Sequence, residues 1–131
     1  MHEARLKDIP FFASLTRSEL TLVGRQADEL DVKAGTVLAK EGDLGREFFV
    51  VESGTAEVTK DGEHIAEMGP GDFFGEIALI AEERRTATVT ATSPMLVIVM
   101  SRAGFRAIDS QLPAVHARVA AAIEERRART P

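Results

Sequence analysis

The middle of the chain is a series of short β-favouring runs separated by glycine turns. The runs cover residues 36–40, 47–51, 55–59, 65–68, 86–92 and 96–100. The turns carry Gly35, Gly42, Gly54, Gly62, Gly69 and Gly71. Many strands at short and even spacing are typical of an antiparallel barrel or sandwich, whereas βαβ units place a helix between consecutive strands. We therefore predict an antiparallel β domain over residues 28–101.

The run 86–92 shows the strand pattern most clearly. Successive side chains of a strand point to opposite faces of the sheet. The small apolar residues of this run therefore share one face, and the threonines share the other. The first set is Ala87, Val89 and Ala91, and the second is Thr86, Thr88, Thr90 and Thr92.

A helix is expected before the β domain, over residues 17–27. Thr16 and Glu19 have the spacing of a capping box, in which the side chain of each residue accepts a hydrogen bond from the backbone amide of the other. Leu15 and Leu20 flank this box as the two members of a hydrophobic staple.

Two further helices are expected after the β domain. Ser101 can cap a short helix that carries Phe105 and Ile108 and ends near Ser110. Pro113 suits the first position of a final helix, because an N–H group there would have no intrahelical partner. Apolar residues recur along this last helix at helical spacing, leaving Arg118 and Glu125 to solvent. They are Leu112, Val115, Val119, Ala122 and Ile123.

Length and composition limit what the chain can do. Its 131 residues fit a single domain, which we divide into a helical segment 1–27, the β domain 28–101 and closing helices 102–128. The net charge of −5 argues against binding DNA or an anionic membrane through a basic surface. Because the chain has no cysteine, it has neither disulfides nor thiolate metal sites.

The sequence shows no targeting or membrane-spanning segment. Residues 1–10 lack the apolar core of a signal peptide. The longest apolar run, residues 95–100, is too short to cross a bilayer. We expect a cytoplasmic protein without membrane insertion and without direct binding to nucleic acid.

One segment interrupts the strand pattern with the pair Gly75-Glu76, which is followed by the apolar run 77–80. A helix that begins at Glu76 leaves several backbone N–H groups without intrahelical partners. These donors, together with the positive end of the helix dipole, form a seat for a phosphate group. Gly75 lets a ligand approach the backbone where a Cβ atom would obstruct it.

A mobile anion needs a full positive charge as well, since a helix terminus contributes only about 0.3–1 kcal/mol in exposed settings. Arg85, or its neighbour Arg84, supplies a planar guanidinium suited to two phosphate oxygens. Glu76 would repel a phosphate, but its carboxylate can accept a hydrogen bond from a sugar hydroxyl. Phosphate and sugar at the same turn indicate a nucleotide.

Residues 74–79, Phe-Gly-Glu-Ile-Ala-Leu, and 85–89, Arg-Thr-Ala-Thr-Val, resemble the phosphate-binding cassette of the cyclic nucleotide-binding domain. The resemblance covers most of the chain. It includes Phe11, Phe12 and Leu15 at the helical entry, the turn positions Gly35, 41–43, Phe48 and Gly54, and the closing helices 102–128. It implies an α+β fold: an antiparallel, jelly-roll-like β-roll of about eight strands with an N-terminal helix, a short phosphate-binding helix and two C-terminal helices.

The resemblance also implies a role for each cassette residue. Glu76 binds the ribose 2′-hydroxyl, and Arg85, rather than Arg84, binds the cyclic phosphate. Backbone amides and a threonine hydroxyl complete the site. The expected ligand-binding residues are Gly75, Glu76, Ile77, Ala78, Arg85 and Thr86. The implied ligand is cAMP or cGMP, with no other cofactor and no metal.

The same resemblance implies a regulatory switch. The helices after Ser101 close over the base, with Val119, Ala122 or Ile123 as candidate contacts, and act on an effector protein or domain that the sequence does not identify. The alternative is a family member that has lost its ligand and serves as a protein interaction module.

Enzymatic activity is not expected. The glycines of residues 69–75 do not have the spacing of a dinucleotide fingerprint. A cupin-like metalloenzyme would need clustered ligands, but His2, His64 and His116 lie in the entry segment, a strand and the final helix. No nucleophile is paired with a base.

Overall fold

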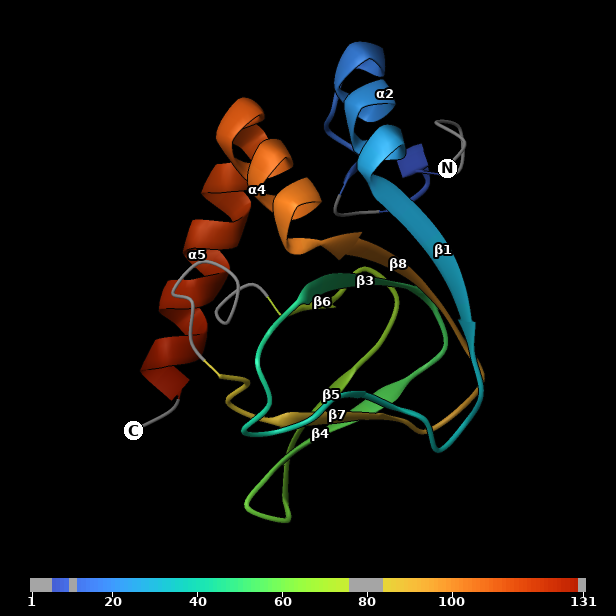
Figure 1. Ribbon diagram of the computed structural model, residues 1–131, viewed down its shortest axis with the longest axis vertical. Helices are drawn as coiled ribbons and strands as arrows, with labels where there is room; N and C mark the ends of the chain where they lie inside the picture. The colour runs from blue at the N-terminus through green and yellow to red at the C-terminus, as the bar shows by residue number, and fades with distance from the viewer. Residues whose placement is uncertain (1–5, 10–11, 76–83, 130–131) are drawn as a thin grey trace.

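Two four-stranded sheets lie one above the other, and helices cover the outer side of one of them (Figure 1). This computed structural model describes residues 6–9, 12–75 and 84–129. The sheet next to the helices has strand order β1-β8-β3-β6, and the other has order β2-β7-β4-β5. The strands are β1 (Ala27–Val32), β2 (Val37–Ala39), β3 (Glu47–Ser53), β4 (Ala56–Lys60), β5 (Glu63–Met68), β6 (Phe73–Phe74), β7 (Thr88–Ala91) and β8 (Met95–Ser101). The helices are α2 (Arg17–Gln26), α4 (Arg102–Gln111) and α5 (Pro113–Arg129).

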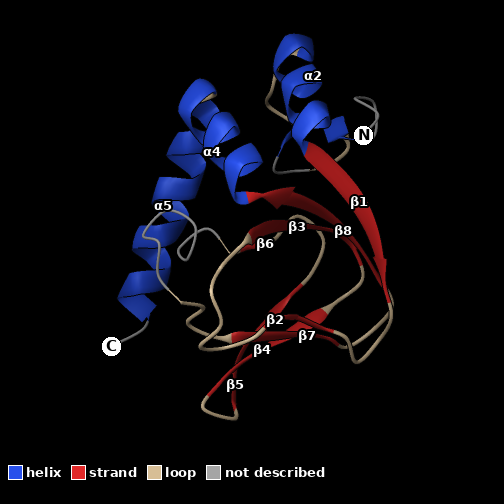
Figure 2. Cartoon of the chain, in the orientation of Figure 1, coloured by secondary structure: helices blue, strands red, loops and turns tan. Residues whose placement is uncertain are grey.

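The sheets confirm the predicted antiparallel β-roll. Each strand pairing in both sheets is antiparallel. Figure 2 shows the two layers of strands, with α2 and α4 at one end and α5 running along one side. In β7 the predicted alternation holds, since Val89 and Ala91 are buried, whereas Thr88 and Thr90 are half-buried. The strand is shorter than predicted, because Arg84 and Arg85 pair with the connection between β2 and β3 and residues 86–87 form a bend before the ladder begins.

Two strands, β1 and β6, are not predicted from the sequence pattern. In β1, residues 28–31 are all exposed, so no alternation of apolar and polar residues marks the strand. Its register is set by continuous pairing with β8, from Ala27 opposite Met100 to Val32 opposite Met95. Strand β6 has only two residues, which pair with Val50 and Phe49 of β3. Both strands are defined by long-range pairing.

The helix boundaries follow the predicted caps. The capping box at the start of α2 is complete: Glu19 N donates to Thr16 Oγ1 at 3.2 Å, and Thr16 N donates to Glu19 Oε1 at 2.8 Å. Ser101 caps α4 by accepting from the Gly104 amide at 3.1 Å, and Pro113 is the first residue of α5. The last helix runs to Arg129, one residue beyond its predicted end.

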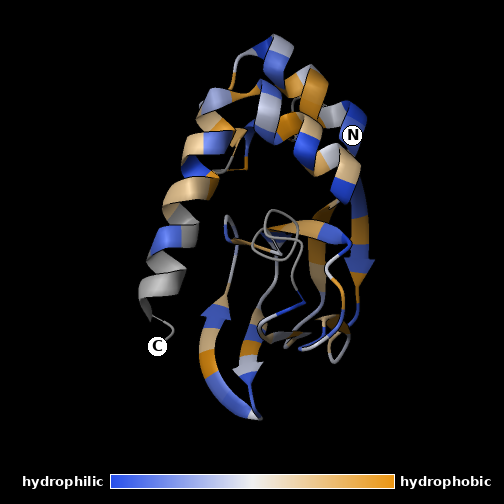
Figure 3. Ribbon diagram, turned by 60° about the vertical axis from the view of Figure 1, so that its left-hand side comes forward, coloured by the Kyte–Doolittle hydropathy of each residue, from blue (hydrophilic) through white to orange (hydrophobic). Residues whose placement is uncertain are grey.

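Strand β3 separates two hydrophobic cores. Phe48 and Val50 point toward the helices, where Phe48 contacts Phe105 of α4 with ring centroids 4.5 Å apart. Phe49 and Val51 point into the β-roll. Strand β6 divides in the same way: Phe73 joins the helix-side core, and Phe74 stacks on Phe49 at 4.8 Å. These two phenylalanines are therefore core residues. Figure 3 shows hydrophobic and hydrophilic residues alternating along the helices.

The predicted short phosphate-binding helix begins at Glu76 and lies outside the described residues. What the structure describes are its two flanks, Gly75 directly after β6 and the segment from Arg84 to β7.

Candidate functional site

Gly75 directly follows strand β6 and has a backbone conformation that favours glycine. Its φ angle is +98°, in the left-handed region. A Cβ atom at this position would lie 2.5 Å from Nη1 of Arg85 and 2.7 Å from the carbonyl oxygen of Glu47. Glycine is thus required twice, by the turn and by the close approach of the arginine side chain.

Arg85 is the buried member of the arginine pair. Arg85 is only 9% exposed, and its Nη2 donates to the Glu47 carbonyl at 2.7 Å. Its backbone is equally fixed, since Arg85 N donates to Asp43 O at 2.7 Å and Arg85 O accepts from Gly42 N at 2.9 Å. The guanidinium is therefore held inside the roll beside Gly75, where burial strengthens its interaction with an anion.

Arg84 is the other member of the pair. It is exposed, and its Nη1 donates to the Gly42 carbonyl at 2.9 Å. Residue-level reasoning left Arg84 and Arg85 as alternatives for the phosphate, and only Arg85 is turned inward. Thr86, the next residue of the expected site, is exposed and follows Arg85 in the turn that leads to β7.

The other expected site residues Glu76, Ile77 and Ala78 lie outside the described part of the chain. Of the three candidate base contacts on α5, the structure describes the side chain of one. Val119 is fully buried in the helix-side core, together with Val115 and Ile108. The side chains of Ala122 and Ile123 are outside the description.

Sequence reasoning missed the contribution of the connection between β2 and β3, residues 40–46. This segment and Glu47 supply the backbone groups that hold Arg85. The sequence indicates a turn at residues 41–43, but nothing in it shows which distant residue the turn contacts. Its position becomes clear only when β7 and β3 are assembled in space.

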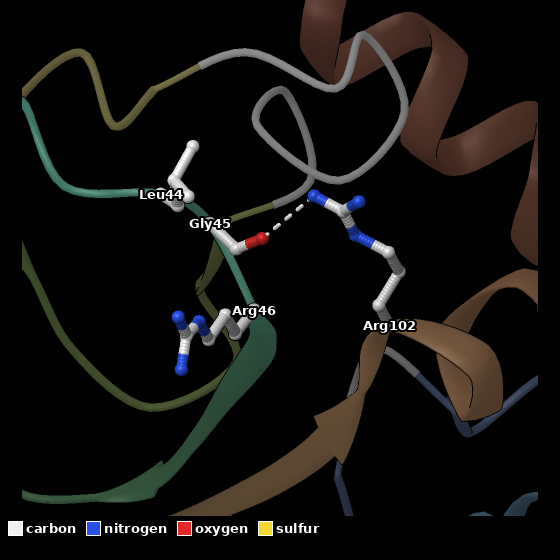
Figure 4. A pocket seen from close by; sticks show the side chains of 4 residues that line it. All are labelled: Leu44, Gly45, Arg46 and Arg102. Atoms are coloured by element: carbon white, nitrogen blue, oxygen red, sulfur yellow. Dashed lines mark hydrogen bonds between the residues drawn. The ribbon is translucent and has the colours of Figure 1, made fainter.

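A cavity of about 420 Å³ lies next to this connection (Figure 4). The described residues that line it are Leu44, Gly45, Arg46 and Arg102. Arg102, at the start of α4, crosses to the connection and donates from Nη2 to the Gly45 carbonyl at 2.9 Å.

Metal and membrane sites are not found in the part of the chain that the structure describes. Within it, no three histidines or carboxylates gather as metal ligands. None of its helices has the length and apolar character needed to span a bilayer.

Comparison with known proteins identifies the family. The model of the family described as cyclic nucleotide-binding domain matches residues 29–111. The cAMP-dependent protein kinase regulatory subunit of Yarrowia lipolytica is 38% identical over 108 residues, which are 81% of this chain and 29% of that protein. The chain therefore spans less than a third of the length of this curated relative.

Solved structures share the fold. The regulatory domain of Toxoplasma gondii PKA, crystallised with cAMP, is 27% identical with a TM-score of 0.81 over 95% of this chain and 49% of that one. The catabolite activator protein of Thermus thermophilus is 30% identical with a TM-score of 0.77 over 92% of this chain and 58% of that one. The β-roll, its helices and the family match over residues 29–111 together show that this chain belongs to the cyclic nucleotide-binding domain family.

Proposed function

We propose that this domain binds cAMP at the turn between β6 and β7 and acts as a regulatory switch. The observation that carries the proposal is the buried guanidinium of Arg85, held against Gly75 inside the β-roll. Because burying a charge is costly, a buried guanidinium in this position suits a site that binds an anion. The cyclic phosphate is that anion, and the family match supports the nucleotide.

The roles of the site residues follow from their chemistry. Arg85 holds the phosphate through charge-assisted hydrogen bonds, and the amides at Gly75, Ala78 and Thr86 add neutral donors. Glu76 accepts a hydrogen bond from the ribose 2′-hydroxyl. Ile77 lies between Glu76 and Ala78 in the cassette sequence. These interactions depend on one another, because the glycine turn sets the distance between the amides and the guanidinium.

The switch acts through the two C-terminal helices. Helix α4 packs on the roll through Phe105 and Ile108, and α5 continues from it after Leu112. Nucleotide binding that orders the cassette changes which position of these helices is favoured, provided that the bound contacts form in only one position. The domain is regulatory rather than catalytic. Its effector is a partner protein or domain, for which the kinase-subunit relatives make a kinase catalytic subunit the first candidate.

The test is a calorimetric titration with cAMP and with cGMP. In wild type we expect saturable binding, tighter for cAMP. Arg85→Leu removes two charge-assisted hydrogen bonds, so its affinity should fall by about a hundredfold or more. Glu76→Ala should weaken binding less, because it loses one sugar contact. Failure of both nucleotides to bind wild type would instead support a ligand-free interaction module.

Two controls separate the site from general charge effects. Arg84→Leu removes the exposed neighbour and should keep most of the affinity. Arg25→Leu removes an exposed arginine on α2 and changes the net charge by the same amount. An Arg84→Leu variant as weak as Arg85→Leu would contradict the assignment of the phosphate to Arg85.

A further inference from the structure

The connection between β2 and β3, residues 40–46, lies against the proposed phosphate arginine. Two backbone hydrogen bonds join them: Arg85 N donates to Asp43 O at 2.7 Å, and Gly42 N donates to Arg85 O at 2.9 Å. Two further contacts hold the connection in place. Glu41 N donates to Thr88 Oγ1, and Asp61 N donates to Glu41 Oε1, each at 3.0 Å. The connection is therefore bonded to the strand that follows Arg85 and to a second turn.

The far end of the same connection is bonded to helix α4. Arg102, the first residue of α4, donates from its backbone N to Arg46 O at 3.0 Å. Its Nη2 donates to the carbonyl of Gly45 at 2.9 Å, across the cavity shown in Figure 4. Arg102 is half-buried and Gly45 is buried, so this charged hydrogen bond is partly shielded from water.

We propose that Arg102 is a positioning residue that couples helix α4 to Arg85 through the connection between β2 and β3. The inference rests on the proposed function, since it adds a route between the nucleotide site and the helices that the site is to move. The bonds to Arg85 end at Gly42 and Asp43, and the bonds to Arg102 end at Gly45 and Arg46. A displacement of α4 from the roll must break the Arg102 bonds or pull the connection away from Arg85.

The coupling works in both directions. An anion that fixes Arg85 fixes the connection, and the connection then favours the position of α4 in which Arg102 reaches Gly45. By linkage, a helix position without this bond weakens the hold on the anion by the same factor. Arg102 is distinct from the binding residues, because it acts on Arg85 through a backbone segment.

Arg46 provides a matched control. It lines the same cavity, its side chain is exposed, and within the described residues that side chain makes no hydrogen bond or ion pair. Arg46→Ala therefore removes a guanidinium from the cavity and leaves every bond of the connection in place. Arg102→Lys keeps the charge at the start of α4 but replaces the long planar donor with a single point charge.

The first measurement is amide hydrogen exchange by NMR in the absence of nucleotide. The readout is the exchange rate of the Arg85 and Gly42 amides divided by that of Val50, a core amide that reports any change in global stability. We expect this ratio to rise about tenfold in Arg102→Ala, the factor associated with one hydrogen bond to a charged group. It should rise less in Arg102→Lys and stay unchanged in Arg46→Ala. An unchanged ratio in Arg102→Ala, or an equal rise in Arg46→Ala, overturns the proposal.

The second measurement adds saturating cAMP. In wild type, cAMP should change the exchange of the α4 amides, residues 102–111. In Arg102→Ala, cAMP should still bind more tightly than to Arg85→Leu, while the α4 amides no longer respond. An α4 response equal to that of wild type overturns the coupling and leaves the proposed function intact. A wild-type protein that does not bind cAMP overturns the proposed function, and the nucleotide-free ratio then decides the coupling alone.

Discussion

Nη1 of Arg85 occupies the space beside Gly75 in which any other residue would carry its side chain. We predict that Gly75→Ala is one of the most damaging single-methyl changes in the domain. The left-handed φ angle costs a non-glycine residue about 1–2 kcal/mol. The new methyl group would in addition displace the guanidinium of Arg85 from its seat, because the second obstacle, the Glu47 carbonyl, belongs to the backbone. The affinity for cAMP should fall together with the free energy of unfolding, measured by calorimetry and urea denaturation.

Gly35→Ala is the matched control for this change. Its φ angle of +89° imposes similar strain, but an added Cβ would have open space around it. It should lose stability and keep its affinity for cAMP. Equal affinity in the Gly75→Ala and Gly35→Ala variants would show that the closeness of Arg85 and Gly75 does not matter for binding.

Substituting Gly54 tests how much close backbone packing contributes to stability at a position away from the candidate site. An added Cβ would collide with the carbonyl oxygen of Pro94 and lie 2.8 Å from the Cα atom of Met95. Gly54→Ala should therefore destabilise the protein by more than the strain of about 1–2 kcal/mol that Gly35→Ala carries. Thermal unfolding of the two variants side by side measures the difference, and equal melting temperatures would refute it.

The capping box of α2 should contribute measurably to stability. Thr16→Ala removes the side-chain acceptor for the Glu19 amide and should cost about 0.5–2 kcal/mol. Ser18→Ala, at an exposed position of the same turn, should be close to neutral. Urea denaturation of both variants provides the comparison, and a Ser18→Ala variant as unstable as Thr16→Ala would mean that the cap is not the cause.

Phe105 anchors α4 on the sheet. It is 1% exposed and packs against Phe48, so Phe105→Ala should cost about 3–5 kcal/mol through lost burial and the cavity left behind. Ile65→Ala is the contrasting change, because Ile65 is 53% exposed on β5 and should contribute little. A destabilisation below about 1 kcal/mol for Phe105→Ala would show that the core relaxes around the loss.

The sequence predicts best the elements whose cause is local. The capping box at Thr16, the serine cap before α4 and Pro113 each act within one turn of helix, and each is found as expected. The alternation in β7 is likewise a local pattern. By contrast, β1 has four exposed residues in a row, and only its partner β8 makes it a strand.

The candidate site divides in the same way. Gly75 and Arg85 could be named from residue chemistry and family resemblance, since glycine and arginine at this spacing form part of a known motif. Residue chemistry alone leaves Arg84 and Arg85 open and the family resemblance favours Arg85, which is the one that turns into the roll. The contacts of Arg85 with Asp43 and Glu47 depend on the assembled sheets, because backbone carbonyls carry no signal in the sequence.

The two faces of β3 make the helices and the roll separate packing compartments. Phe48 and Val50 serve one compartment, while Phe49 and Val51 serve the other. If α4 and α5 slide over the sheet, as the proposed switch requires, they exchange contacts in the first compartment and leave the packing of Phe49 and Val51 in place. A wall shared by two cores thus confines the repacking to one side, and the Arg102 bonds to residues 45 and 46 carry the shift around that wall toward Arg85.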